Sequence, residues 1–203
     1  MTAITISRQL GSLGCQVGRE AAARLGYSLV WREAINQAAI RAGAPEVALA
    51  VIDELDIFGL RPDRQAVDAY LQATAQVMVE LAGAGKIVIV GRAGQVILRG
   101  REDVFHLRVI APEAVRAARV AAGRAVSLEA ALAQVKASDR NRRKYLREYY
   151  GVRWDDPELY DLVINTARLT SRSAADLVCC AFDERFSSMP VGDNPARIET
   201  DCD

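Results

Sequence analysis

The sequence is poor in lysine and has a single histidine. Its 203 residues include only Lys86, Lys136 and Lys144, so arginine supplies almost all of the positive charge. An arginine presents a planar fork that binds phosphate or carboxylate through two hydrogen bonds, whereas a lysine presents a point charge. A codon bias of the genome would account for most of this excess, so an arginine indicates phosphate binding only where its position supports that role.

An excess of charge of one sign is also missing. The 26 Lys and Arg residues balance the 26 Asp and Glu residues, which gives a formal net charge of zero. Proteins that bind duplex nucleic acid or an anionic membrane surface usually carry clustered positive charge. No apolar run reaches the length of about 20 residues that a membrane span needs. We therefore expect neither a duplex nucleic acid nor a membrane as a partner.

The cysteines show no metal-binding spacing. They are Cys15, Cys179, Cys180 and Cys202, and they form neither a C-x-x-C pair nor a cysteine–histidine cluster. Because a zinc site needs such a cluster, we expect no metal bound by side chains. The chain also begins in a strand pattern, without the charged and apolar regions of a signal peptide. These features predict a reduced, cytoplasmic protein.

Apolar runs typical of buried strands alternate with helical patterns along the chain. Because strands that are apolar throughout are buried on both faces, the alternation predicts an α/β fold of three layers, with a central parallel sheet of about five strands flanked by helices. The length fits one domain, over residues 1–186. The expected strands are Ala3–Ser7, Tyr27–Val30, Lys86–Gly91, Asp103–Ala111 and Leu159–Ala167.

Helical periodicity and capping residues define the expected helices. They are Arg19–Gly26, Glu33–Arg41, Pro45–Asp56, Asp63–Gly85, a helix opened by Pro112, a helix that Ser127 caps and that runs to about Tyr149, and Ser171–Phe186. Residues 187–203 are short of apolar side chains and contain prolines, so we expect a loose tail there.

A glycine-rich segment, SRQLGSLGCQVGRE, follows the first expected strand. A turn from a strand into a helix is a common phosphate site, because free backbone N–H groups meet there. The usual lysine of a phosphate loop is absent: its place falls on Gly14 or Cys15, and the place of the usual hydroxyl falls on Cys15 or Gln16. A tight turn without a ligand explains the pattern equally well. The candidate loop residues are Arg8, Gly11, Ser12, Leu13, Gly14, Cys15 and Gln16.

Arg92 follows the most apolar of the expected strands, Lys86–Gly91. Ligands of parallel sheets bind at the carboxyl ends of the strands, so we expect Arg92 to be exposed there and able to reach an anion. A surface ion pair, which is worth little energetically, is the competing interpretation. The position favours a phosphate-binding role.

Three further arginines share one face of the helix that ends near Tyr149. Arg140, Arg143 and Arg147 are three and four residues apart. Like charges on one face repel each other unless an anion lies between them, and guanidinium groups bind a polyphosphate through paired contacts. A solvated charged face is the alternative.

Together these segments resemble the cytidylate kinase-like proteins, a branch of the nucleoside monophosphate kinases. The opening ISRQLGSLG follows that family's ISRE.GSGG, and IVIVGRAG is similar to its IVGR strand end. DRNRRKYLREYY resembles the family's D..R..Y lid, and YDLVINTARL resembles its final strand, YDLVINT..L. The resemblance covers the chain from residue 4 to about 185.

The resemblance implies a single P-loop kinase-like domain with a helical substrate-binding insert at about 32–62 and a lid at about 136–155. It also implies transfer of the γ-phosphoryl group of ATP to a nucleoside monophosphate or a related small phosphate acceptor. Mg²⁺ would be held mainly through phosphates and water. A homo-oligomer is left open.

Residue roles follow from the same resemblance. Arg92 and Arg32 would hold the acceptor. The three arginines of the lid, Arg140, Arg143 and Arg147, would act on the transferring group and stabilise the charge that develops on it. The residues themselves, apart from the resemblance, offer Arg8, Arg19 and the lid arginines for the charge that the loop lacks, and Arg8, at the end of the first strand, is the first candidate.

Departures from the family pattern bear on activity. Cys15 stands where a basic residue is common, and Trp31 replaces the acid of the family's YYDRE segment. Val90 and Ala93 stand where cytidylate kinases have acids. These residues therefore give no support to a preference for cytosine.

Two other functions stay open. A kinase-derived module that binds a nucleotide without turnover is favoured by the missing lysine and the missing acid at Val90, whereas Arg92 and the lid arginines favour an enzyme. Binding of single-stranded nucleic acid finds some support in Tyr145, Tyr149 and Tyr150 beside these arginines, but the zero net charge opposes it.

Overall fold

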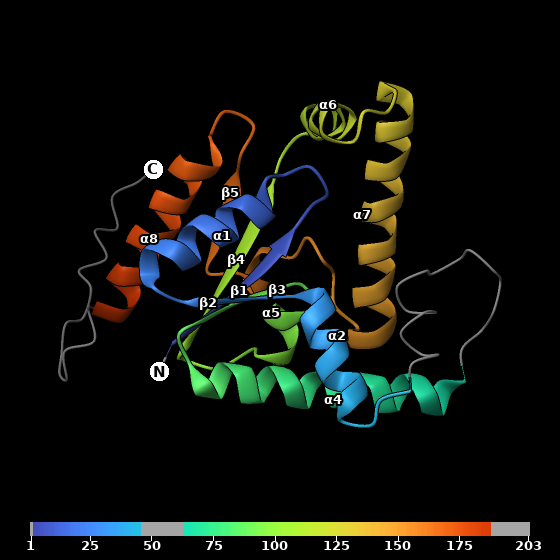
Figure 1. Ribbon diagram of the computed structural model, residues 1–203, viewed down its shortest axis with the longest axis vertical. Helices are drawn as coiled ribbons and strands as arrows, with labels where there is room; N and C mark the ends of the chain where they lie inside the picture. Colours follow the sequence, from blue (N-terminus) through green and yellow to red (C-terminus); the bar gives the residue numbers. More distant parts are fainter. Residues whose placement is uncertain (1, 46–62, 188–203) are drawn as a thin grey trace, which may run out of the picture.

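The structure, a computed structural model, describes residues 2–45 and 63–187. At its centre lies a parallel sheet with the strand order β2-β3-β1-β4-β5 (Figure 1). The strands are β1 (Ala3–Arg8), β2 (Ser28–Trp31), β3 (Ile87–Val90), β4 (Val104–Ile110) and β5 (Leu162–Asn165). The predicted parallel sheet of five strands is confirmed.

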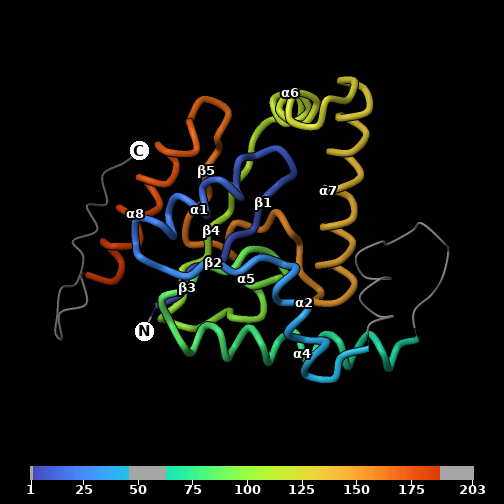
Figure 2. The backbone as a smooth tube through the Cα atoms, viewed as in Figure 1, coloured from blue at the N-terminus to red at the C-terminus, as the bar shows by residue number. Residues whose placement is uncertain are grey.

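Helices cover both faces of this sheet (Figures 1 and 2). α1 and α8 pack together on one face, α4 and α5 pack on the other, and α6 packs on α7 beside the sheet. The described helices are α1 (Gly14–Leu25), α2 (Arg32–Arg41), α4 (Arg64–Ala84), α5 (Gly94–Ile97), α6 (Glu113–Arg124), α7 (Leu128–Tyr150), the 3₁₀ helix η1 (Pro157–Leu159) and α8 (Ser171–Ser187).

Side chains of β3 show why both faces need a helical layer. Successive residues of a strand point to opposite faces. Val88 and Val90 join the core formed with α1 and α8, whereas Ile87 and Ile89 join the core formed with α4. The strand is therefore apolar throughout, as expected for a central strand that is covered on both sides.

The strand register brings the ends of β1 and β3 together. Ile6 pairs with Val90, so the residues that follow, Arg8 in β1 and Arg92 after β3, leave the sheet at the same edge. This edge faces α2, α5 and α7, which supply walls of the site described below together with Trp154.

Some predicted boundaries differ from those observed. α1 begins at Gly14, not at Arg19, because the second half of the glycine-rich segment already has helical hydrogen bonding. The short helix α5 was not expected. The last strand is shorter than predicted, since the residues before it form η1.

The predicted N-cap of α7 is confirmed, whereas Pro112 directly precedes α6 and is not part of its first turn. Ser127 caps α7 by accepting a hydrogen bond from Ala130 N. The helix expected at Pro45–Asp56, the later part of the insert and the tail lie outside the described residues, apart from Pro45 and Ser187. None of the described helices is both long and apolar enough to cross a membrane.

Candidate active site

The glycine-rich loop leaves backbone N–H groups at the start of α1 without helical partners. Gly11 and Leu13 have left-handed φ values of 79° and 64°, and the helix begins at Gly14. The first helical hydrogen bond runs from Val17 N to Leu13 O at 2.9 Å, so the N–H groups of residues 14–16 have no acceptor in the helix. No side chain of the N-cap residue caps them. The positive end of α1 therefore favours an anion.

Side chains from neighbouring segments bind the carbonyl groups of the loop. Arg119 Nη1 donates to Gly11 O at 3.4 Å, and Thr166 Oγ1 donates to Ser12 O at 2.8 Å. Arg119 also donates to the backbone carbonyl of Thr166 at 2.7 Å. These contacts hold the loop from α6 and from the residue that follows β5.

The side chain of Ser12 points into the fold. It is 0% exposed, and its hydroxyl lies 2.9 Å from Gln9 O and 3.0 Å from Val109 O. Ser12 is one of the residues predicted to bind phosphate. Because its hydroxyl is buried, only its backbone could contribute to phosphate binding.

A cavity of about 360 Å³, which we call the loop cavity, lies against the loop and the start of α1. Every predicted loop residue except Ser12 lines it, together with Arg119 from α6 and Arg142 from α7. None of its lining residues that the structure describes is acidic. The surroundings favour a ligand with several negative charges.

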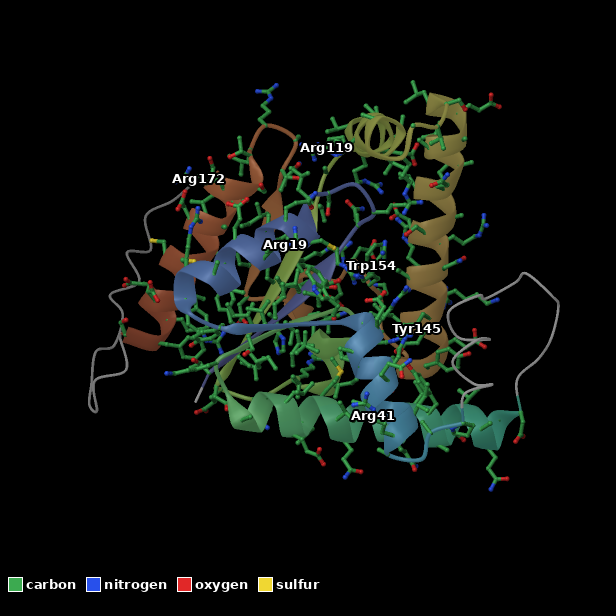
Figure 3. The ribbon with its side chains drawn as sticks, in the orientation of Figure 1. Arg19, Arg41, Arg119, Tyr145, Trp154 and Arg172 are labelled. Atoms are coloured by element: carbon green, nitrogen blue, oxygen red, sulfur yellow. The ribbon has the colours of Figure 1, made fainter. Side chains whose placement is uncertain are left out.

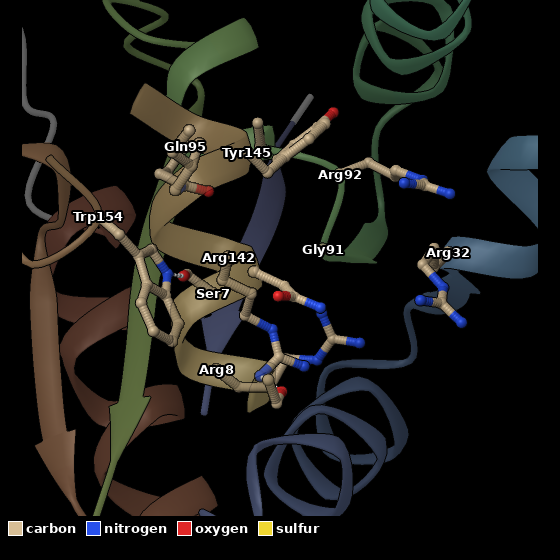
Figure 4. A pocket seen from close by; sticks show the side chains of 13 residues that line it. Ser7, Arg8, Arg32, Gly91, Arg92, Gln95, Arg142, Tyr145 and Trp154 are labelled. Atoms are coloured by element: carbon tan, nitrogen blue, oxygen red, sulfur yellow. Dashed lines mark hydrogen bonds between the residues drawn. The ribbon is translucent and has the colours of Figure 1, made fainter. Parts of the chain in front are cut away.

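A second cavity, of about 310 Å³, lies at the carboxyl ends of β1 and β3, and we call it the strand-end cavity (Figure 4). Its walls combine strand-end residues with α2, α5 and α7. It too has no acidic residue among its described walls. The lining residues are Ser7, Arg8, Arg32, Gly91, Arg92, Ala93, Gln95, Ser138, Asn141, Arg142, Tyr145, Leu146 and Trp154.

Arg8 lines both cavities and passes close to two glycines. A Cβ at Gly14 would lie 2.4 Å from Arg8 Cβ, and one at Gly91 would lie 2.6 Å from Arg8 Nη1. The Nε atom of Arg8 is buried without a hydrogen-bond partner. A buried cationic donor of this kind gains stability from an anionic ligand.

Arg142 is the other residue that lines both cavities. Its Nη1 donates to Ser138 Oγ at 2.6 Å, and its guanidinium lies beside that of Arg8 (Figure 4). Burial, and secondly the charge of Arg8, lower the pKa of Arg142 to about 10. Among the described residues, neither arginine forms a salt bridge. An anion bound between the two guanidinium groups would offset the cost of burying the charge of Arg142 and the repulsion from Arg8.

Arg92 is 7% exposed, so the expectation of an exposed side chain is wrong. Its Nε donates to Asn36 Oδ1 at 2.7 Å, and the same oxygen accepts from Tyr70 Oη at 2.8 Å. Its guanidinium lies 5.7 Å from the Tyr70 ring centre. These contacts from α2 and α4 orient Arg92 at the strand-end cavity, which it lines as predicted.

Arg32 also lines the strand-end cavity, at the first residue of α2. Its side chain is exposed at the rim of the cavity and forms an ion pair with Glu33 at 3.1 Å. The structure thus brings the two predicted acceptor residues, Arg32 and Arg92, to one cavity (Figure 4).

The predicted lid arginines do not line either cavity. Arg140, Arg143 and Arg147 are exposed on α7, whereas Arg142 turns toward the site. A signal for Arg142 exists in the sequence. The D..R..Y spacing of the lid pattern falls on Asp139, Arg142 and Tyr145, not on the three arginines selected by their common face.

Trp154 is a site residue that the sequence did not reveal. It lies between the sheet and α7 (Figure 3), and its Nε1 donates to Ser7 Oγ at 2.8 Å. The guanidinium of Arg108 lies 4.6 Å from its ring centre, and that of Arg142 lies 5.8 Å away. Trp154 therefore fixes the segment after α7 to the end of β1.

Metal ligands are not gathered in the part of the chain that the structure describes. No group of three or more His, Cys, Asp or Glu side chains could hold an ion there. The loop cavity fits the phosphates of a nucleotide through N–H groups and arginines. Any Mg²⁺ that accompanies a nucleotide would be coordinated by phosphate oxygens and water, because these walls offer no carboxylate.

Sequence comparisons point to one family. The model of the cytidylate kinase-like family matches residues 3–168. The curated cytidylate kinase of Pyrobaculum calidifontis is 30% identical over 193 residues, which cover 92% of this chain and 97% of that protein. The cytidylate kinase of Pyrobaculum aerophilum is 31% identical over 193 residues, with coverage of 92% and 98%.

Solved structures share the fold. An uncharacterized protein from Eubacterium ventriosum aligns with a TM-score of 0.71 at 20% identity, covering 90% of this chain and 99% of that one. A gluconokinase from Sinorhizobium meliloti gives a TM-score of 0.54 at 16% identity, with coverage of 92% and 97%. A shikimate kinase from Acinetobacter baumannii gives 0.53 at 12% identity, with coverage of 93% and 95%. The fold is that of the P-loop kinases.

Proposed function

This chain belongs to the cytidylate kinase-like family, and on that premise we propose that it transfers the γ-phosphoryl group of ATP to a nucleoside monophosphate or a related small phosphate acceptor. One observation carries the proposal: Arg8 and Arg142 line both the loop cavity and the strand-end cavity. A phosphoryl group that passes between donor and acceptor needs positive charge at such a boundary.

The loop cavity suits the donor. The free N–H groups of residues 14–16 would bind phosphate oxygens of ATP, with Arg119 at the same wall. Arg8 would supply the charge that a phosphate-loop lysine normally provides. Mg²⁺ bound to the phosphates adds further positive charge near the transferring group when ATP is present.

The strand-end cavity suits the acceptor. Arg92, oriented by Asn36, is assigned to the acceptor's phosphate, and Arg32 would add charge from the exposed side. The names of the curated relatives favour a nucleoside monophosphate as this acceptor.

The reaction then needs positioning and electrostatics. An oxygen of the acceptor's phosphate attacks the γ-phosphorus, the bond from that phosphorus to the β–γ bridging oxygen breaks, and ADP leaves. Charge develops on the oxygens of the group in transfer, where Arg8 and Arg142 would donate hydrogen bonds. Both cations are already in place in the folded protein, so the reaction requires little reorganisation of them.

A second candidate is a module that binds nucleotide without transfer. Cys15 lines the loop cavity, so the residue in the usual lysine's place would meet the phosphates without a positive charge. This candidate predicts ATP binding with no turnover, which separates it from the enzyme.

Arg142→Met tests the proposal. Removing this guanidinium should lower kcat by about 100-fold, the usual order for one donor to developing charge, while the affinity for the phosphate chain of ATP falls by a smaller factor, about tenfold. The measurement is ADP release with ATP, Mg²⁺ and a nucleoside monophosphate.

Lys144→Gln is the matched control, because Lys144 is an exposed cation on the same helix that lines neither cavity. We expect its kcat to stay within about threefold of the wild-type value, as for most surface substitutions. Equal losses in both variants would remove Arg142 from the transfer step.

A further inference from the structure

A buried ion pair joins α6 to α7 next to the site. Arg116 and Asp139 are 3% and 5% exposed, and two contacts connect them: Nη2 to Oδ2 at 2.8 Å and Nη1 to Oδ1 at 3.3 Å. Such a two-point contact fixes the direction of both side chains as well as their separation. Neither residue lines the loop cavity or the strand-end cavity.

Arg116 also connects α6 to the glycine-rich loop. Its Nε donates to Ala111 O at 2.8 Å, just past the end of β4, and its Nη1 donates to Leu10 O at 3.4 Å. A Cβ at Gly11 would lie 2.6 Å from Arg116 O, so loop and helix are in close contact. The position of Arg116 is therefore tied to that of the loop.

Asp139 lies about one helical turn before Arg142, on the inward side of α7. Its neighbour Ser138 also helps to hold Arg142, because the Ser138 hydroxyl accepts from Arg142 Nη1 at 2.6 Å. If α7 rotated or slid along its axis, Asp139 would lose Arg116 and become a buried charge without its partner, which is strongly destabilising. Only one register of α7 satisfies the pair.

The energetics favour a geometric role over a stabilising one. Desolvation of two charges largely cancels their attraction, so apolar residues of similar size often give equal or greater stability than a buried ion pair. What apolar residues do not supply is a directional contact that selects one register of the helix.

We propose that Arg116 and Asp139 are positioning residues, which hold α7 in the register that places Arg142 between the two cavities. The inference rests on the proposed function, because the position of Arg142 matters when a phosphate chain lies beside it. Both residues act through Arg142 and contact no substrate.

The test is a double-mutant cycle read out as affinity for inorganic tripolyphosphate, measured by calorimetry, with kcat as a second readout. Asp139→Asn keeps the side-chain shape and removes the charge, and Arg142→Met removes the guanidinium. Each is expected to weaken tripolyphosphate binding at least tenfold. Since both act through one cation, the double variant should bind within about twofold of Arg142→Met alone.

Two further variants control for folding. Lys136→Gln removes an exposed ion pair with Glu113, at 3.7 Å, which joins the same two helices one turn earlier in each. Its affinity should stay within about twofold of wild type. Arg116→Met with Asp139→Leu replaces the buried pair by apolar side chains, so no unpaired charge stays buried; the variant should still unfold cooperatively, with a thermal midpoint lowered by the lost hydrogen bonds to Ala111 O and Leu10 O, while binding stays at least tenfold weaker.

Losses that multiply in the double variant, or an affinity restored by the apolar replacement, would overturn the positioning role. Wild-type protein that binds tripolyphosphate but transfers no phosphoryl group would refute the proposed function alone, and the affinity cycle would still decide the role of the ion pair. Wild-type protein that binds no tripolyphosphate would overturn both.

Discussion

Arg8 reaches the boundary between the two cavities by passing Gly14 and Gly91, where no side chain blocks it. Gly91 also has a φ of 95°, a conformation that other residues adopt only with strain. The glycine after β3 therefore leaves the space that the Arg8 side chain of β1 occupies. This relation is invisible in the sequence, because Gly91 lies 83 positions after Arg8 and only the strand register brings the two together.

Gly91→Ala should therefore affect function more than stability. The left-handed φ would cost about 1–2 kcal/mol in the free energy of unfolding. The new Cβ would displace the Arg8 guanidinium, so we expect kcat to fall about tenfold or more, as for loss of a donor to developing charge. Urea unfolding and ADP release measure the two effects.

Gly83→Ala is the control for this substitution. Gly83 lies in α4, where an added Cβ would have no atom within 4 Å, and its φ is not left-handed. Alanine there should stabilise the protein by about 0.5–1 kcal/mol and leave kcat unchanged. A Gly91→Ala variant that loses stability but keeps its kcat would show that Arg8 does not need its observed position.

The two strand-end arginines show what a sequence pattern can and cannot provide at this scale. Arg8 and Arg92 are predictable as site residues, because apolar runs locate strands and the ends of parallel strands share one edge. The burial of Arg92 is not predictable, since it depends on Asn36 from α2 and Tyr70 from α4. Such contacts between distant segments leave no local pattern.

At the scale of elements, α7 determines which arginines enter the site. Its buried side follows Ala131, Val135, Asp139 and Leu146. Arg142 continues this helical stripe, three residues after Asp139 and four before Leu146. The spacing of the charges at Arg140, Arg143 and Arg147 describes the exposed side of the helix equally well. The stripe of buried residues indicates which side packs inward.

The segment after α7 is fixed to the sheet through Trp154, and Trp154→Phe tests this anchor. The variant loses the hydrogen bond from Nε1 to Ser7 Oγ and part of the packing on Arg108. We expect the free energy of unfolding to fall by about 1–3 kcal/mol. The KM for the acceptor should rise as well, because Ser7 and Trp154 both line the strand-end cavity.

Trp31→Phe is the matched control, since Trp31 is half-buried and lines neither cavity. Its KM for the acceptor should stay unchanged. Equal increases in KM for both tryptophan variants would argue that Trp154 affects the acceptor only through general stability.

At the scale of the whole molecule, a chain of zero net charge concentrates cations at one place. Arginines from β1, α2, α6, α7 and the end of β3 line the two cavities, and no described lining residue is acidic. Clefts lined by charge of one sign attract ligands of the opposite sign. Net charge therefore says little about the partner of this protein, whereas the distribution of charge indicates phosphate.

The fold itself is largely predictable, because it depends on repeated local features. Alternation of apolar strands with capped helices indicates a parallel sheet, and five strands were expected and are observed. The details that matter for chemistry depend on single long-range contacts, such as the inward turn of the Ser12 hydroxyl. Local propensity does not determine such contacts.

We propose that the wild-type protein moves a phosphoryl group across the boundary formed by Arg8 and Arg142. To test this transfer, the protein is incubated with Mg²⁺ and ATP labelled in the γ-phosphate, together with each of a panel of nucleoside monophosphates. We predict that the label appears in the matching nucleoside diphosphate and that unlabelled ADP forms in equal amount. Label that remains in ATP with every acceptor, in protein that demonstrably binds ATP, would contradict the claim and favour a module that binds nucleotide without turnover.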